Sequence, residues 1–272
     1  MSNKDRQSHN HTVIVKSLPA ELTPEEIAEL ETAEKMPIVF DDDCPKMTEE
    51  MLKQFRRMSV NPIKLYFIRH GETDWNIQKR LQGREDIPMN TAGREQAAQC
   101  AKFLSLYWKK KGYSEPMIIT SPLSRARDTA VKIAEGLGIP ESKIIQDAAL
   151  VERDYGHQSG MTYQQRAEYE KTHPDSSEIE TREHTAQRVW EAVNSYMEIC
   201  RQQNQEHLIL VTHGGCIRSA LRAIPESGID WNQIMLNAGI TILDGSDGHF
   251  RILEHNKSAE ALYHSLLPKQ RT

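Results

Sequence analysis

Short apolar runs alternate with amphipathic stretches along most of this chain. Runs over 65–68, 117–120, 144–145 and 207–211 are predicted as buried strands, and 238–243 with 250–254 as a closing hairpin. Helical spacing of apolar residues predicts helices over about 91–108, 124–136, 162–171, 183–203 and 216–223. Alternating strands and helices are typical of an α/β fold. We predict a three-layer α/β/α sandwich with a mostly parallel central sheet.

The first 62 residues differ from the rest in being acidic and poor in apolar positions. Thr23 and Glu26 form a capping-box pattern, with Pro24 at the first helical position, so a helix is predicted to about residue 35 and a shorter one over 51–58. We therefore predict a partly helical N-terminal extension (1–62), a main domain (63–256) and a C-terminal tail (257–272). The extension is too small for a core of its own, so it is expected to pack on the main domain or to bind a protein partner.

Composition narrows the class of protein. Hydrophobic residues make up 38% and charged residues 27% of the 272 residues, as in ordinary globular proteins, and the net charge of −5 gives no indication of nucleic-acid binding. Apolar runs are too short to cross a bilayer, and no signal peptide opens the chain. The four cysteines lack any zinc or disulfide spacing, so reduced thiols and a cytoplasmic location are expected.

Cationic and imidazole side chains follow three of the predicted strands. The segments are Arg69-His70-Gly71, Ser124-Arg125 and His213-Gly214-Gly215. Because parallel strands bring their carboxyl ends to one edge of a sheet, these groups are expected to converge there. Arginine binds phosphate as a planar fork, and a glycine turn that opens a helix offers backbone N–H groups to an anion. No carboxylate cluster suited to Mg²⁺ and no P-loop accompany them, so we predict a phosphate site without a metal or cofactor.

Several motifs in this order resemble the histidine phosphatase superfamily, the phosphoglycerate mutase-like proteins. They are RHGETDWN at 69–76, the loop 82–88, SPLSRARDTA at 121–130, LVERDYG at 150–156 and VTHGGCIR at 211–218. The resemblance covers about residues 63–253, and it implies that 63–256 is a histidine phosphatase catalytic domain.

The resemblance implies a role for each matching residue. His70 would be the nucleophile, while Arg69, Arg125 and His213 would bind the phosphate oxygens. Glu152 would be the general acid and base, and it fits the motif better than the neighbouring Asp154. Further phosphate or substrate contacts are expected from Thr73, Asn76, Gln82, Gly83, Gly214 and Gly215.

These residues favour a phosphatase that acts on a small phosphorylated metabolite. Glu152 and His213 are 61 positions apart, which is too close for the insertion that caps the mutases, and His213-Gly214-Gly215-Cys216 departs from the mutase pattern His-Gly-Asn-Ser. A bisphosphoglycerate-dependent mutase and a non-catalytic phosphate-binding regulator stay open as alternatives, as does a homodimer. The complete catalytic set opposes the non-catalytic alternative.

Overall fold

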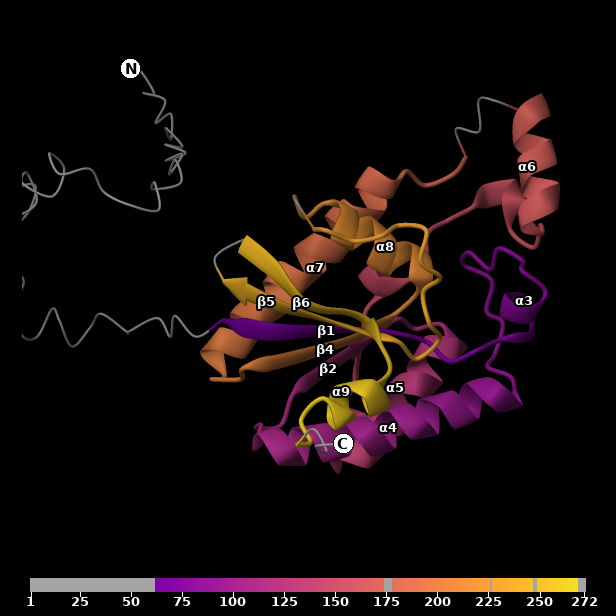
Figure 1. Ribbon diagram of the computed structural model, residues 1–272. Helices are drawn as coiled ribbons and strands as arrows, with labels where there is room; N and C mark the ends of the chain where they lie inside the picture. Colours follow the sequence, from indigo (N-terminus) through magenta and orange to yellow (C-terminus); the bar gives the residue numbers. More distant parts are fainter. Residues whose placement is uncertain (1–61, 174–177, 226, 247–248, 269–272) are drawn as a thin grey trace, which may run out of the picture. The chain divides into compact units, whose positions relative to one another are not determined.

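The computed structural model describes residues 62–173, 178–225, 227–246 and 249–268. The helices predicted in the N-terminal extension lie outside these residues, as does most of the extension itself. Within the described part, the predicted α/β fold is confirmed: a central sheet, mostly parallel, is flanked by helices (Figure 1).

The central sheet contains six described strands. They are β1 (Ile63–Arg69), β2 (Met117–Thr120), β3 (Ile145–Gln146), β4 (His207–Thr212), β5 (Ile240–Ser246) and β6 (His249–Lys257). The order across the sheet is β3-β2-β4-β1-β5-β6. β1 to β4 are mutually parallel, whereas β5 and β6 add the predicted hairpin in antiparallel sense. β1 and β4 lie in the middle and are buried on both faces, so each has an unbroken apolar run at its centre, 65–68 in β1 and 208–211 in β4.

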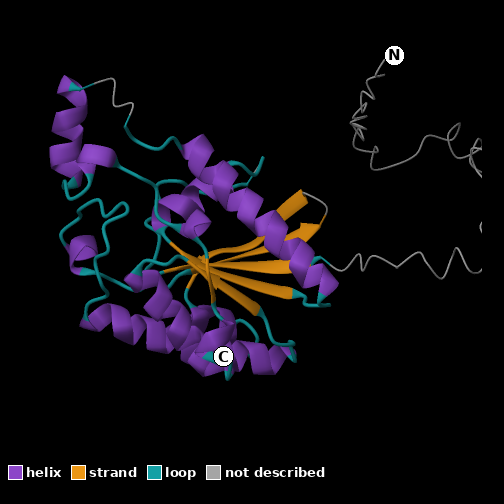
Figure 2. Cartoon of the chain, turned by 180° about the vertical axis from the view of Figure 1, so that it is seen from behind, coloured by secondary structure: helices purple, strands orange, loops and turns teal. Residues whose placement is uncertain are grey.

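Helices cover both faces of the sheet (Figure 2). α4 (Thr91–Lys111), α5 (Ser124–Leu137) and α9 (Ala259–His264) pack with one face, and α7 (Arg182–Gln202) and α8 (Gly214–Arg222) pack with the other. α6 (Tyr163–Thr172) contributes no buried residue and stands away from the sheet, and α3 (Asp74–Ile77) is a single turn after β1. Short 3₁₀ turns cover Glu141–Lys143, Ala148–Leu150 and Gly156–Gln158.

Alternation along β1 divides the core into two clusters. Tyr66 and Ile68 point to the face covered by α4, α5 and α9, whereas Leu65 and Phe67 point to the face covered by α7 and α8. All four side chains are fully buried. A strand side chain changes face at each residue, so this single strand anchors both helical layers.

The ends of the helices follow local capping chemistry. Asn90 caps α4 by accepting a hydrogen bond from the Gly93 amide, and Thr162 forms a capping box with Gln165 at α6. α4 ends at Gly112, whose φ of 66° is the left-handed conformation that glycine adopts at little cost.

Two features differ from the sequence-based expectation. α3 is not among the predicted helices, because the Thr73 side chain caps a turn too short to show helical periodicity. Residues 257–272 were predicted as a tail, yet α9 within them buries Ala259 and Leu262 in the same cluster as α4. The apolar spacing of one short helix gives little signal before its partner is known. No described helix is long and apolar enough to cross a membrane.

We expect acid to destabilise the protein partly through His207. This side chain is 1% exposed, and its ring lies 4.1 Å from that of Tyr113 and 5.2 Å from that of Trp108. Burial and the neighbouring Lys64 lower the pKa of His207 from 6.5 to about 4. Between these values the unfolded chain binds more protons, so stability falls as pH drops from about 6.5 to about 4.

Urea unfolding at pH 7 and pH 5 measures this effect. Between pH 7 and pH 5, the free energy of unfolding of wild type should fall by about 1–2 kcal/mol more than that of His207→Phe. The exposed His157→Gln is the control and should behave as wild type. An equal loss in His207→Phe and wild type would contradict this assignment.

Candidate active site

The carboxyl ends of three neighbouring strands meet at one edge of the sheet, as predicted. Arg69 at the end of β1 is in register with Thr212 of β4, and Thr120 of β2 is in register with Val211. His70, Ser121 and His213 follow these strands directly. Residues far apart in the sequence are thereby brought into one buried cluster.

The His70 ring is held in one orientation by the residue that follows it. Its Nδ1 lies 2.6 Å from the carbonyl oxygen of Gly71, so Nδ1 carries the proton and donates it. Nε2 is then left with a free lone pair. Burial, together with Arg69 and Arg125, lowers the pKa of His70 well below its usual range. The imidazole is therefore neutral at pH 7, with Nε2 able to act as a nucleophile.

His213 is also neutral, and its tautomer is the opposite one. Arg125 Nε donates to His213 Nδ1 at 3.2 Å, so His213 carries its proton on Nε2 and donates to Ser121 Oγ at 2.8 Å. Burial and the charge of Arg125 lower the pKa of His213 well below its usual range. The His213 and His70 ring centres are 5.2 Å apart.

Two arginines, one fully buried and one partly buried, surround the histidines. Arg125 is fully buried and donates from its other nitrogens to the carbonyl oxygens of Glu85 and Gly83, at 2.6 and 2.9 Å. Arg69 donates to Met235 O, and its buried Nε has no partner among the described residues. Burial lowers the pKa of Arg69, and that of Arg125 to about 10, so both remain charged at pH 7. These contacts leave N–H donors on both side chains, which suits an anion bound between them.

Glu152 lies at the N-terminus of α8. Its Oε2 accepts from the Gly215 amide at 3.0 Å, and its Oε1 accepts from the Cys216 amide at 3.0 Å and the Arg153 amide at 2.8 Å. A carboxylate at this position interacts favourably with the helix dipole. With four lone-pair positions and three bonds, the group keeps one position for exchanging a proton with another molecule.

Several residues predicted to contact phosphate make internal contacts in the structure. The Gly215 amide donates to Glu152, as described. Thr73 and Asn76 form the capping box of α3, and Asn76 Oδ1 also accepts from Asn237 Nδ2 at 3.1 Å. Asn76 Nδ2 makes no hydrogen bond to the described residues and remains a free donor. Among the described residues, Asn76 thus keeps an unused donor, whereas the Thr73 hydroxyl donates to Asn76 Oδ1.

The predicted loop contacts also divide by role. Gly83 has a φ of 52° and offers its carbonyl to Arg125, so it shapes the loop. Gln82 is 8% exposed, and its Oε1 has no partner among the described residues. Gly214, with Gly215, opens α8 beside Arg69. Each of these predicted residues lies beside the cluster, although their contacts to a ligand stay predictions.

Some residues of the site were not predicted. Asn237 donates to the carbonyl oxygen of His70 at 3.2 Å, and the Ala238 amide donates to the same oxygen at 3.2 Å. Met235 accepts from Arg69, and Ser121 accepts from His213. The segment 235–237 carries no motif or periodicity, so no sequence signal marked it. Ser121, in contrast, directly follows a predicted strand and opens the motif at 121–130.

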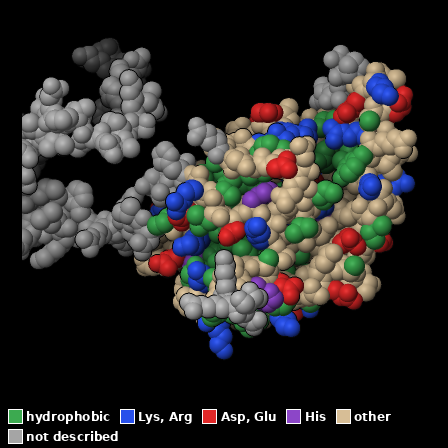
Figure 3. Space-filling view, viewed as in Figure 1, with side chains coloured by type: hydrophobic (Ala, Val, Ile, Leu, Met, Phe, Trp, Pro, Cys, Tyr) green, Lys and Arg blue, Asp and Glu red, His purple; other side chains and the backbone are tan. Residues whose placement is uncertain are grey.

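Positive charge also surrounds the site. Arg153 and Arg166 lie 5.4 and 5.8 Å from the centre of the Tyr155 ring. Burial raises the pKa of the Tyr155 hydroxyl, so it stays protonated at pH 7. Lys and Arg side chains gather between α8 and α6 in the space-filling view (Figure 3). These elements contribute Arg218 and Arg166, and the nearby start of α7 contributes Arg182. An anionic molecule would be attracted to this face.

The fold and this cluster define an α/β protein with histidine and arginine side chains gathered at the carboxyl edge of its sheet. A family profile, the histidine phosphatase superfamily (branch 1), matches residues 65–258. The chain belongs to this superfamily.

Individual relatives carry phosphatase and mutase names. The chain is 32% identical over 192 residues to the uncharacterized phosphatase PhoE of Bacillus subtilis, covering 70% of this chain and 92% of the relative. It is 31% identical over 187 residues to a 2,3-bisphosphoglycerate-dependent phosphoglycerate mutase of Bartonella bacilliformis, covering 63% and 85%. Among solved structures, a mycobacterial glucosyl-3-phosphoglycerate phosphatase complexed with VO3 matches with a TM-score of 0.59 and 28% identity, covering 72% and 100%. The phosphatase names support a phosphatase-type enzyme.

We expect Gly93→Ala to disturb the loop that orients His70. Gly93 at the start of α4 and Gly71 after His70 pack backbone to backbone, and a Cβ on Gly93 would overlap the backbone of Glu72. The substitution should therefore destabilise the protein by about 1–3 kcal/mol in urea unfolding. It should also shift the NMR signal of the His70 Nδ1 proton, because Gly71 O accepts that proton. Glu95→Ala, an exposed change in the same helix, should do neither. A stable Gly93→Ala protein with unchanged His70 signals would contradict this packing constraint.

Proposed function

We propose that this protein is a metal-independent phosphatase that hydrolyses a small phosphomonoester through a phosphohistidine on His70. The observation that carries the proposal is the neutral His70 ring, with a free Nε2, beside the buried Arg125 and the partly buried Arg69, both of which keep N–H donors that no described residue accepts. The buried Arg69 Nε in particular lacks a partner that a phosphate oxygen would provide. Family membership and the phosphatase names of relatives support the same activity.

In the first step, His70 Nε2 attacks phosphorus as the ester P–O bond breaks. Arg69 and Arg125 stabilise the charge on the equatorial oxygens, and His213 joins them when a phosphate oxygen replaces Ser121 Oγ as the acceptor of its Nε2 proton. Glu152, in its protonated form, gives its proton to the departing alkoxide. The products are the free alcohol and a phosphohistidine, and Glu152 is left as a carboxylate.

In the second step, water attacks the phosphohistidine. The Glu152 carboxylate accepts a proton from the water as the P–N bond breaks, which restores the neutral His70 and the protonated acid. Inorganic phosphate then leaves. Two arginines supply the positive charge that a metal supplies in many phosphoryl-transfer enzymes, so the proposal includes no metal or cofactor.

The substrate is proposed to be a small phosphorylated metabolite. α6, which places Arg166 beside Tyr155, carries no apolar face, and this favours a polar molecule. Arg153 and Arg166 add positive charge there. The proposal places the enzyme in the cytoplasm, where the buried free thiols of Cys100, Cys200 and Cys216 would stay reduced.

Turnover of p-nitrophenyl phosphate tests the proposal directly. Wild type should hydrolyse it, and His70→Ala should lose at least about a thousandfold in kcat, because the covalent step has no other nucleophile. His173→Ala changes an exposed histidine directly after α6. It is the control and should keep wild-type turnover. If wild type does not hydrolyse the substrate but exchanges phosphoryl groups in the presence of 2,3-bisphosphoglycerate, the protein is a mutase and the phosphatase proposal is wrong.

Chelation and an oxyanion test the charge-based mechanism. Turnover should be unchanged in EDTA, because arginine side chains rather than a divalent cation neutralise the phosphate. Vanadate should inhibit competitively, since it resembles the transferred phosphoryl group in the transition state. Loss of turnover in EDTA that Mg²⁺ restores would contradict the proposed site.

A further inference from the structure

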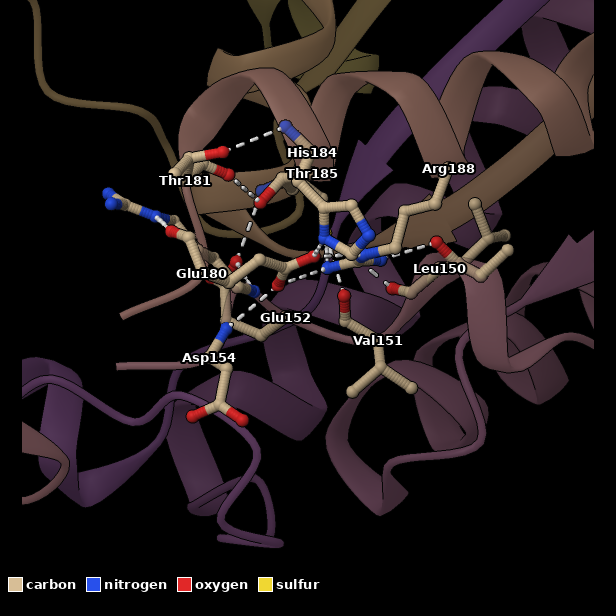
Figure 4. A network of polar contacts seen from close by, with 12 residues as sticks. Leu150, Val151, Glu152, Asp154, Glu180, Thr181, His184, Thr185 and Arg188 are labelled. Carbon is tan, nitrogen blue, oxygen red and sulfur yellow. Dashed lines mark hydrogen bonds and ion pairs between the residues drawn. The ribbon is translucent and has the colours of Figure 1, made fainter. Parts of the chain in front are cut away.

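We propose that Glu180 and Arg188 are positioning residues that hold the loop bearing Glu152 in register with the phosphate site. This inference rests on the proposed function and adds to it two residues outside every motif described above. Glu180 precedes α7 and Arg188 lies in its second turn, so both come from a different part of the chain from Glu152 (Figure 4).

Glu180 binds the backbone on the C-terminal side of Glu152. Its Oε2 accepts from the Asp154 amide at 3.0 Å, two residues after Glu152. Its own carbonyl oxygen accepts from Arg153 Nε. Its amide also donates to the Asp154 carbonyl oxygen at 3.0 Å. The residue therefore contacts both of the positions that follow Glu152, once through its side chain and twice through its backbone.

Arg188 binds the backbone on the other side. Its Nη1 donates to the carbonyl oxygen of Ala149, three residues before Glu152. Its Nε and Nη2 donate to Glu180 at 2.7 and 3.1 Å. Nη2 also lies 3.7 Å from the sulfur of Cys216, whose amide donates to Glu152. One ion pair thus joins both flanks of the Glu152 loop and touches the start of α8.

The Glu180–Arg188 pair can hold the Glu152 loop in one geometry because both side chains are largely removed from water. The Glu180 and Arg188 side chains are 5% and 15% exposed. Burial alone raises the pKa of Glu180, but hydrogen bonds from Arg188 and the Asp154 amide outweigh it and bring the pKa to about 2. The carboxylate is therefore charged throughout the working range. Buried ion pairs add little net stability but have well-defined geometry, as expected of a positioning element.

The same network reaches the loop that Arg125 binds. Arg84 lies 3.6 Å from Glu180 Oε2 and 3.4 Å from Asp154 Oδ2. Its neighbours Gly83 and Glu85 offer their carbonyls to Arg125. The loop around a phosphate-binding arginine and the loop around the acid are therefore tied to one carboxylate. A displacement of about 1 Å in such a group costs on the order of a hundredfold in rate.

A comparison of two leaving groups tests the inference. p-Nitrophenolate departs without a proton, whereas the alkoxide of β-glycerol phosphate needs one from Glu152. We expect Glu180→Gln to lower kcat/KM for β-glycerol phosphate by roughly tenfold to a hundredfold and to change that for p-nitrophenyl phosphate much less. The ratio kcat/KM reports the step in which the leaving group departs, so the later hydrolysis step does not obscure the difference.

Controls separate positioning from a general loss of structure. Glu178→Gln removes a carboxylate two residues away that is 58% exposed and paired only with His157, and it should leave both kcat/KM values unchanged. In a Glu152→Gln background, Glu180→Gln should add no further loss, because its effect passes through Glu152. Arg188→Lys keeps the charge, but its side chain cannot bind Glu180 and Ala149 at the same time. It should therefore lower kcat/KM for β-glycerol phosphate selectively, as Glu180→Gln does. This variant replaces Glu180→Gln in the test if Glu180→Gln does not fold.

Equal losses for the two substrates would overturn the inference, as would additive losses in the Glu152→Gln background. Failure of the proposed function has a different signature: wild type would then show no His70-dependent turnover of either substrate.

Discussion

The placement of two arginines, the fully buried Arg125 and the partly buried Arg69, beside the histidines is the constraint on which the rest of this structure depends. Two cations that lose water repel one another and lose solvation, and each must find acceptors inside the protein. Their described acceptors are carbonyl oxygens and one imidazole nitrogen, not carboxylates in direct contact. No described carboxylate therefore neutralises the positive charge of the arginines by direct contact, and the two histidines near them are neutral.

That field explains the arrangement of the groups around it. A neutral His70 is a better nucleophile than an imidazolium, and a neutral His213 can accept from Arg125 while donating to Ser121. Glu152 is near enough to raise the pKa of both arginines in opposition to burial, yet it is bound to backbone amides of α8 and not to the guanidinium groups. A direct ion pair would have neutralised the site. The helix terminus holds the carboxylate apart and keeps it available for proton transfer.

The positions of these groups are fixed by the packing of the central strands and by specific contacts of the loops. β1 and β4 are central, in parallel register and buried on both faces, so the ends that carry His70 and His213 are fixed by packing in two cores. The loops are held by specific contacts instead: Gly71 against Gly93, Asn237 against His70, and the Glu180–Arg188 pair around the Glu152 loop. Rigid strands therefore carry His70 and His213, whereas a polar network holds the loop of Glu152.

The sequence by itself determined the α/β class, the parallel core strands and the convergence of His70, Arg125 and His213, because apolar runs and strand-end motifs are local signals. It also marked Glu152 through a motif. Only the tertiary structure decided that α9 belongs to the core, that Thr73 caps α3, and that the Gly215 amide binds Glu152. It alone brought Met235, Asn237, Glu180 and Arg188 to the site. These contacts join residues distant in sequence through single hydrogen bonds, which leave no periodicity along the chain, so they become visible only when the sheet has aligned its strands.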